Sequence, residues 1–210
     1  MDRWYLIRIK TAGLLGGTNL GQEFDYASAC IVCGAGAQPV PPILADLARM
    51  GTKQLDVTAH DGLIIVARDL AERLEGAGPT GFKSLPVRGR SPKAPHDSFR
   101  YLAISYVWPP LHESSRLATE DLCPVCCRAG HFDIHPTGTE LVYSAAPPAA
   151  TDFGLTWEYF GTWHLAARAG RRPVGGHQFV IVSEKARALL GSLHRRHLAF
   201  EPVNLRESAA

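Results

Sequence analysis

"CIVCG", at Cys30–Gly34, holds two cysteines separated by two residues, and "CPVCC", at Cys123–Cys127, repeats this pattern. All five cysteines of the chain lie in these two stretches. Two cysteines at this spacing present both sulfur atoms from one tight turn, so each pair can supply half of a tetrahedral metal site. Because 89 residues separate the pairs, only the tertiary fold can bring them together.

The length and composition are those of a globular protein. The chain has 210 residues, of which 46% are hydrophobic and 20% are charged, so it can bury a sizeable core without covalent crosslinks. Its 22 basic and 20 acidic residues give a net charge of +2. A protein that tracks nucleic-acid phosphates usually concentrates positive charge, so the composition disfavours that class.

The chain shows no targeting or membrane signal. The N-terminal stretch "MDRWYLIRIK" carries charges throughout and is not a signal peptide. The longest apolar run, Leu63–Ala67, is too short to span a bilayer. We therefore expect a cytoplasmic protein with no membrane partner. In a reducing cytosol, Cys-x-x-Cys pairs indicate metal ligands or redox centres before structural disulfides.

Two stretches of the chain resemble each other. "GLIIVARDLAERLEGAGPTGFKSLPV" (Gly62–Val87) aligns without a gap, at an offset of 116 residues, with "QFVIVSEKARALLGSLHRRHLAFEPV" (Gln178–Val203). In each, an apolar strand leads into an amphipathic helix, with Ser183 as the expected N-cap of the second, and a further strand follows. Each stretch also follows one cysteine pair, which favours an internal duplication.

From this pattern we predict an α+β fold with a mixed sheet and packed helices. The chain forms one domain, 1–210, made of two related halves, about 1–90 and 99–205, which a Cys₄ zinc knuckle joins. The Pro- and Ser-rich stretch 88–98 is the expected connector. A short helix is also expected after Pro41 and Pro42, with its end at Gly51.

The predicted metal ligands are Cys30, Cys33, Cys123 and Cys126, holding one structural Zn²⁺ per chain. A thiol redox role for "CPVC" and a set of buried thiols without metal are the alternatives. Three neighbouring residues are candidates to replace a ligand: Cys127, His131 and His135. A site made locally by Cys123, Cys126 and these two histidines would have a much shorter loop than the usual zinc finger.

Enzyme motifs are missing from the sequence. It contains no Gly-x-Ser-x-Gly, no phosphate-binding Gly-Lys-Ser/Thr loop and no His-Glu-x-x-His, so we expect no catalytic residues. The aromatic stretch "FGLTWEYFGTWH" (Phe153–His164) has two interpretations. It is either core or, because Trp and Tyr dominate binding hot spots, a partner surface that uses Trp157, Glu158 and Tyr159.

The two cysteine stretches, together with "TWEYFG" (Thr156–Gly161) and the segment Phe179–Val203, resemble the double-CxxCG motif proteins of myxobacteria. Cys127 stands where that family has Gly. The resemblance implies an immunity protein of a polymorphic toxin system, which binds and neutralises one cognate toxin in the cytoplasm. It also implies that the cysteines are scaffold. The alternatives are a zinc-ribbon nucleic-acid-binding or regulatory module and a CxxC thiol redox protein.

Overall fold

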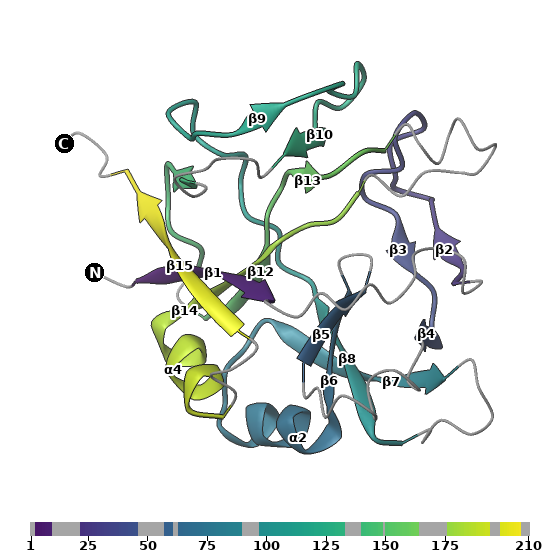
Figure 1. The fold of residues 1–210 in the computed structure, drawn as a ribbon, viewed down its shortest axis with the longest axis vertical. Coiled ribbons are helices and arrows are strands. Elements are labelled where there is room, and N and C mark those ends of the chain that lie inside the picture. The colour runs from purple at the N-terminus through teal and green to yellow at the C-terminus, as the bar shows by residue number, and fades with distance from the viewer. Residues whose placement is uncertain are drawn as a thin grey trace.

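The computed structural model describes residues 3–9, 22–45, 57–60, 63–89, 97–132, 140–148, 150–163, 176–193 and 198–206. Within these ranges the protein is mostly β, with two helices packed on curled mixed sheets (Figure 1). The predicted α+β fold therefore holds in its coarser form, with mixed sheets and packed helices, but strands dominate. No described helix is both long and apolar enough to cross a membrane.

Two five-stranded sheets make up the body of the protein. The first has the order β4-β7-β8-β6-β5, with β4 (Ile43–Ala45), β7 (Phe82–Gly89), β8 (Phe99–Ile104), β6 (Leu63–Ala67) and β5 (Val57–His60). The second has the order β11-β15-β1-β14-β12, with β11 (Val142–Tyr143), β15 (Leu198–Leu205), β1 (Trp4–Ile9), β14 (Val180–Ser183) and β12 (Phe153–Leu155). In both sheets the first pair is parallel and the other three pairs are antiparallel.

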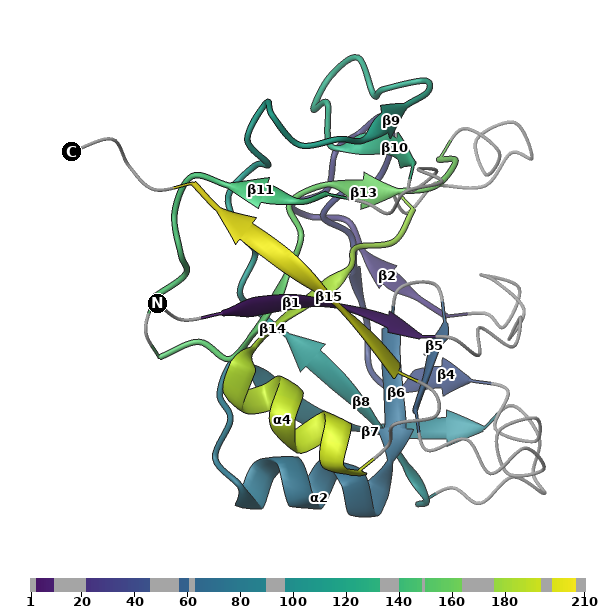
Figure 2. The same cartoon turned by 60° about the vertical axis from the view of Figure 1, so that its left-hand side comes forward.

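The register of the two sheets agrees residue by residue. Ile65 of β6 pairs with Tyr101 of β8, and Ile181 of β14, which is 116 positions later, pairs with Leu6 of β1. By the same alignment, β1 of the second sheet occupies the place that β8 holds in the first. Strand β1, near the N-terminus, thus completes the sheet formed mainly by the C-terminal half. Strand β8, which follows residues 90–96, completes the sheet of the N-terminal half (Figure 2).

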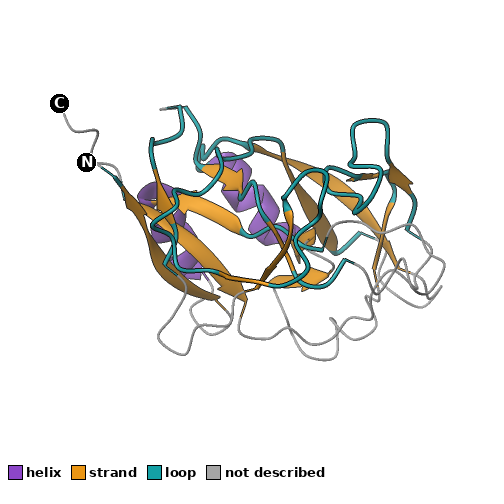
Figure 3. Ribbon diagram, turned by 90° about the horizontal axis from the view of Figure 1, so that it is seen from above, coloured by secondary structure: helices purple, strands orange, loops and turns teal. Residues whose placement is uncertain are grey.

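The two helices occupy equivalent places. Helix α2 (Arg68–Gly76) follows β6, and α4 (Glu184–Leu193) follows β14. In α2 the side chains of Leu70 and Leu74 are buried, and in α4 those of Ala186 and Leu190 are; each pair has the i, i+4 spacing of one helix face. All four belong to one apolar cluster that both sheets line, so the helices share a core (Figure 3).

The stretch after Pro42 corrects the sequence-based prediction of a helix. Ile43–Ala45 form strand β4, which runs parallel to β7 and pairs Ile43 with Val87. The Ile43 side chain is fully buried in a small cluster with Leu63, Ile65, Val87 and Phe99. Burial against a strand therefore overrides the local helix pattern, and the rest of the expected helix lies outside the described residues.

The remaining strands carry the cysteines. Strand β2 (Phe24–Asp25) pairs with β3 (Gln38–Pro39) in one hairpin. Strand β9 (Ala118–Thr119) pairs with β10 (Ala129–Phe132) in a second hairpin, and β13 (Tyr159–Phe160) adds to β10 in parallel. Strands β9, β10 and β13 lie at the end of the molecule opposite α2, and the β2–β3 hairpin lies along one side (Figures 1 and 2).

Candidate metal centre

Each hairpin closes with a cysteine turn of the same backbone design. In the first turn the Gly34 amide donates to the Cys30 carbonyl at 2.8 Å, and in the second the Cys127 amide donates to the Cys123 carbonyl at 3.0 Å. Amides two residues beyond the second cysteine of each pair, those of Ala35 and Arg128, point at the Cys33 and Cys126 sulfurs, at 3.4 and 3.5 Å. Such amide–sulfur contacts stabilise thiolate ligands and orient them.

Cys127 occupies the place of Gly34 in its turn. Gly34 has φ 74°, and Cys127 has φ 55°, so both have a left-handed backbone. Glycine adopts this conformation without strain, whereas a residue with a side chain adopts it at a cost. The second turn therefore keeps the same geometry with a less suitable residue, and the exposed Cys127 side chain is not a member of the cysteine cluster.

The fold brings together the four cysteines that the sequence selects as ligands. The Sγ atoms of Cys30, Cys33, Cys123 and Cys126 all lie within 4.8 Å of one another. The Cys30 and Cys123 sulfurs are 3.7 Å apart, and the Cys33 and Cys126 sulfurs are 3.5 Å apart. Four sulfurs placed tetrahedrally at 2.3 Å from a Zn²⁺ ion are about 3.8 Å from each other. The cluster is thus compatible with one tetrahedral metal ion.

The cysteine surroundings differ in their effect on acidity. Burial raises the pKa of Cys30, but hydrogen bonds from the Cys33 and Val32 backbone and from the Cys126 and Cys123 side chains together lower it to about 7. Burial raises the pKa of Cys33 and of Cys126. Since Cys33 and Cys123 are fully buried, four thiolates at this spacing require a cation among them.

Among the described residues, His131 does not join the cysteine cluster. The His131 Nε2 atom lies 3.1 Å from the Cys127 carbonyl oxygen, and burial lowers the pKa of this ring. His131 is not in the group of possible metal ligands found among the described residues, and His135 lies outside those residues. Cys123 and Cys126 face the first cysteine pair instead.

The segment 156–163 packs across both cysteine turns. The Tyr159 hydroxyl accepts a hydrogen bond from the Gly36 amide at 2.8 Å, and the Tyr159 amide donates to the Arg128 carbonyl. The Arg128 guanidinium donates to the Trp157 carbonyl and lies 5.1 Å from the ring centres of both Trp157 and Tyr159. This segment therefore ties the two turns to each other beside the cysteine cluster.

Glu158 and Tyr159 are buried, with 3% and 5% of their surface exposed, and Trp157 is half-buried. One Glu158 carboxylate oxygen accepts a hydrogen bond from the Leu111 amide, and burial raises the pKa of this carboxyl group. Of the three predicted partner-binding residues, only Trp157 offers substantial exposed surface in the free protein, and the binding role stays a prediction. Sequence reasoning missed Arg128, whose stacked position depends on contacts 29 and 31 residues away.

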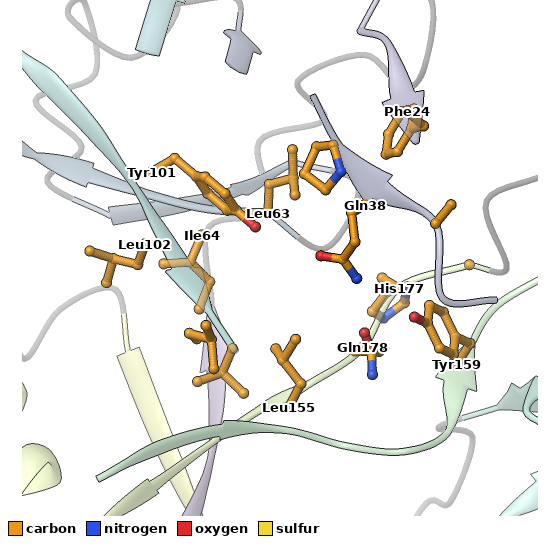
Figure 4. A pocket seen from close by; sticks show the side chains of 15 residues that line it. Phe24, Gln38, Leu63, Ile64, Tyr101, Leu102, Leu155, Tyr159, His177 and Gln178 are labelled. Carbon is orange, nitrogen blue, oxygen red and sulfur yellow. The ribbon is translucent and has the colours of Figure 1, made fainter. Parts of the chain in front are cut away.

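A small pocket lies beside the first cysteine hairpin (Figure 4). The apolar part of its wall is formed by Leu63, Ile64 and Leu155. The polar part is formed by the side chains of Gln38 and Gln178 and by the Tyr101 hydroxyl. Its volume of about 60 Å³ holds a few water molecules, whereas pockets for drug-sized ligands have about 300–1,000 Å³. This pocket is therefore a weaker candidate for a functional centre than the cysteine cluster.

No protein-family model matches this chain, and no curated protein matches it significantly.

Proposed function

We propose that the protein is a zinc-stabilised, non-catalytic immunity protein of the cytoplasm, which binds and neutralises one cognate toxin. The observation that carries this proposal is the cluster of four cysteine sulfurs. A zinc ion with four protein ligands has no open coordination position at which to activate water or a substrate, which is the pattern of a structural site.

The toxin-binding part of the proposal rests on the resemblance to the double-CxxCG proteins. A Cys₄ ion that crosslinks two hairpins distant in sequence supports the scaffold role implied by that resemblance, because metal binding then contributes directly to folding. The small size of the pocket beside the first cysteine hairpin is also compatible with a binding protein.

Metal content and thiol count of protein purified without added metal test the scaffold. We expect one Zn²⁺ per chain, four protected thiols and one reactive thiol, that of the exposed Cys127. A metal-free protein with oxidised cysteines would instead favour the thiol redox alternative.

Co-expression with the toxin encoded by the neighbouring gene tests the biological role. The full chain is expected to restore growth of cells that produce this toxin, and to form a complex with its catalytically inactive variant. A chain that binds zinc but protects against no such toxin would refute the immunity role and leave the scaffold intact.

A further inference from the structure

The cysteine turns expose apolar side chains. Among the described residues, Ile31 and Val125 are the most exposed large apolar side chains, at 86% and 61%, and Leu122 is at 40%. Pro124 is exposed as well. We call these four residues the knuckle tip.

The knuckle tip lies on two adjoining cysteine turns. Ile31 directly follows Cys30, and Pro124 directly follows Cys123. Because the sulfurs of these two cysteines are 3.7 Å apart, the turns that carry the exposed side chains adjoin. Several apolar side chains exposed together on neighbouring turns are typical of an interaction site rather than of an ordinary surface.

The turns are also held rigidly. Amide–sulfur contacts and turn hydrogen bonds fix each backbone, and the Tyr159 hydroxyl ties the first turn to the segment beside the second. Apolar side chains on a rigid backbone lose less conformational entropy when a partner covers them, so more of the contact energy contributes to affinity.

The two hairpins that carry the knuckle tip are acidic. The two hairpins, 22–40 and 118–132, contain four acidic residues and one basic residue, although the chain as a whole carries +2. The acidic side chains are exposed, and they are Glu23, Asp25, Glu120 and Asp121. The single basic residue, Arg128, is half-buried against two aromatic rings. Four thiolates around one Zn²⁺ would add a formal charge of −2.

We infer that the knuckle tip is the surface that binds the toxin, and that the toxin presents a basic face around an apolar recess. This inference rests on the proposed immunity function. Charge complementarity selects the occupant: an acidic surface attracts a basic protein and repels nucleic acid. The exposed apolar side chains would provide the buried centre of the interface, and the carboxylates its polar rim.

Binding of the catalytically inactive toxin to apolar-to-polar variants is the main test. The double variant Ile31→Ser/Val125→Ser is expected to bind at least about 30-fold more weakly than the wild type, the loss typical of hot-spot truncation. Val107→Ser is the matched control, because Val107 is a 39% exposed valine outside both hairpins. All three proteins should retain one Zn²⁺ per chain, since the altered side chains are not ligands.

Charge reversal tests the acidic rim. Glu120→Lys should slow association with the toxin, and the difference from the wild type should shrink as salt is added. Glu113→Lys is the control, because Glu113 is exposed and lies outside the hairpins.

The possible outcomes distinguish a wrong docking surface from a wrong immunity function. If the wild type binds the toxin and the double variant binds it equally well, the knuckle tip is not the docking surface and the immunity role stands. If the wild type neither binds nor protects, both fail. A dimer in sedimentation that the double variant abolishes would make a second copy the occupant and overturn the inference, as would salt-dependent binding of duplex DNA to the tip.

Discussion

The two five-stranded sheets have the same strand order and register, but the connections that follow their edge strands differ. In the first sheet, only residues 61–62 join β5 to β6. In the second sheet, residues 156–179 join the equivalent strands β12 and β14, and they include β13. The longer connection supplies Trp157 and Tyr159, which pack across both cysteine turns.

This difference shows where the near-symmetry of the fold is kept and where it is given up. The strands, the helices and the cysteine turns have counterparts in both halves, because they build the shared core and the four-sulfur cluster. The 156–179 connection has no counterpart of similar length. It places a buried segment on one side of the cluster, and this segment contacts both cysteine turns, which the two symmetric turns alone cannot provide.

Replacement of equivalent cysteines gives the largest expected effect. Cys30→Ser and Cys123→Ser should each abolish zinc binding and lower the free energy of unfolding by more than about 4 kcal/mol, as expected for loss of a structural metal. Equal losses would support equal roles of the two turns. Cys127→Ser is the control and should retain zinc; denaturant titration with zinc analysis makes the measurement, and a similar loss in all three variants would refute the ligand assignment.

Removal of the Tyr159 hydroxyl tests the asymmetric connection. Tyr159→Phe should lower the free energy of unfolding by about 2 kcal/mol, because the Gly36 amide loses its acceptor. Tyr143→Phe is the control: the Tyr143 hydroxyl is buried without a hydrogen-bond partner in the described part of the chain, so its loss should be neutral or stabilising. If the two variants unfold at the same denaturant concentration, the Tyr159 contact contributes little.

The N-cap residues of the two helices can be exchanged between the halves by mutation. Ser183 accepts a hydrogen bond from the Ala186 amide at the start of α4, as the sequence predicted, whereas the equivalent Ala67 gives α2 no side-chain cap. Ser183→Ala should cost about 1 kcal/mol, and Ala67→Ser should add about 0.5 kcal/mol. Thermal unfolding of both variants checks the opposite signs; a stabilising Ser183→Ala would contradict the capping role.

Similarly small effects are expected at the left-handed position of the cysteine turns. Gly34→Ala should lower the free energy of unfolding by about 1 kcal/mol, because a side chain is strained at φ 74°. Cys127→Gly should change it by less than this and in the opposite direction. Stability curves of the zinc-loaded proteins would show this, and a stabilising Gly34→Ala would mean that the turn relaxes around the side chain.

Local patterns in the sequence predict the local features of this structure. Cysteine spacing predicts the two turns, and hydrophobic periodicity predicts both strand-to-helix units, including the buried faces at Leu70 and Leu74 of α2. The same patterns do not indicate which sheet β1 or β8 joins, because both strands carry apolar residues that suit either sheet. That choice depends on pairing between residues more than 170 positions apart, such as Leu6 and Ile181.

The buried surroundings of the cysteine cluster were equally inaccessible to sequence reasoning. The sequence left Tyr159 and Glu158 open between core and partner surface, and only the fold shows that segments distant in the chain bury both of them. Nothing in the sequence marks Ile31 and Val125 among the residues between the cysteines, and only the fold shows how exposed they are.

The exchanged position of β1 has a consequence for synthesis on the ribosome. Strand β1 leaves the exit tunnel well before its two neighbours, β14 and β15, which follow more than 170 residues later in the chain. At about 5–20 residues per second, β1 waits roughly 10–40 s for these partners. The N-terminal sheet, in contrast, can close once β8 has emerged. Translation therefore completes one half of the molecule while a hydrophobic strand stays unpaired, which is the period in which a chaperone would contribute most.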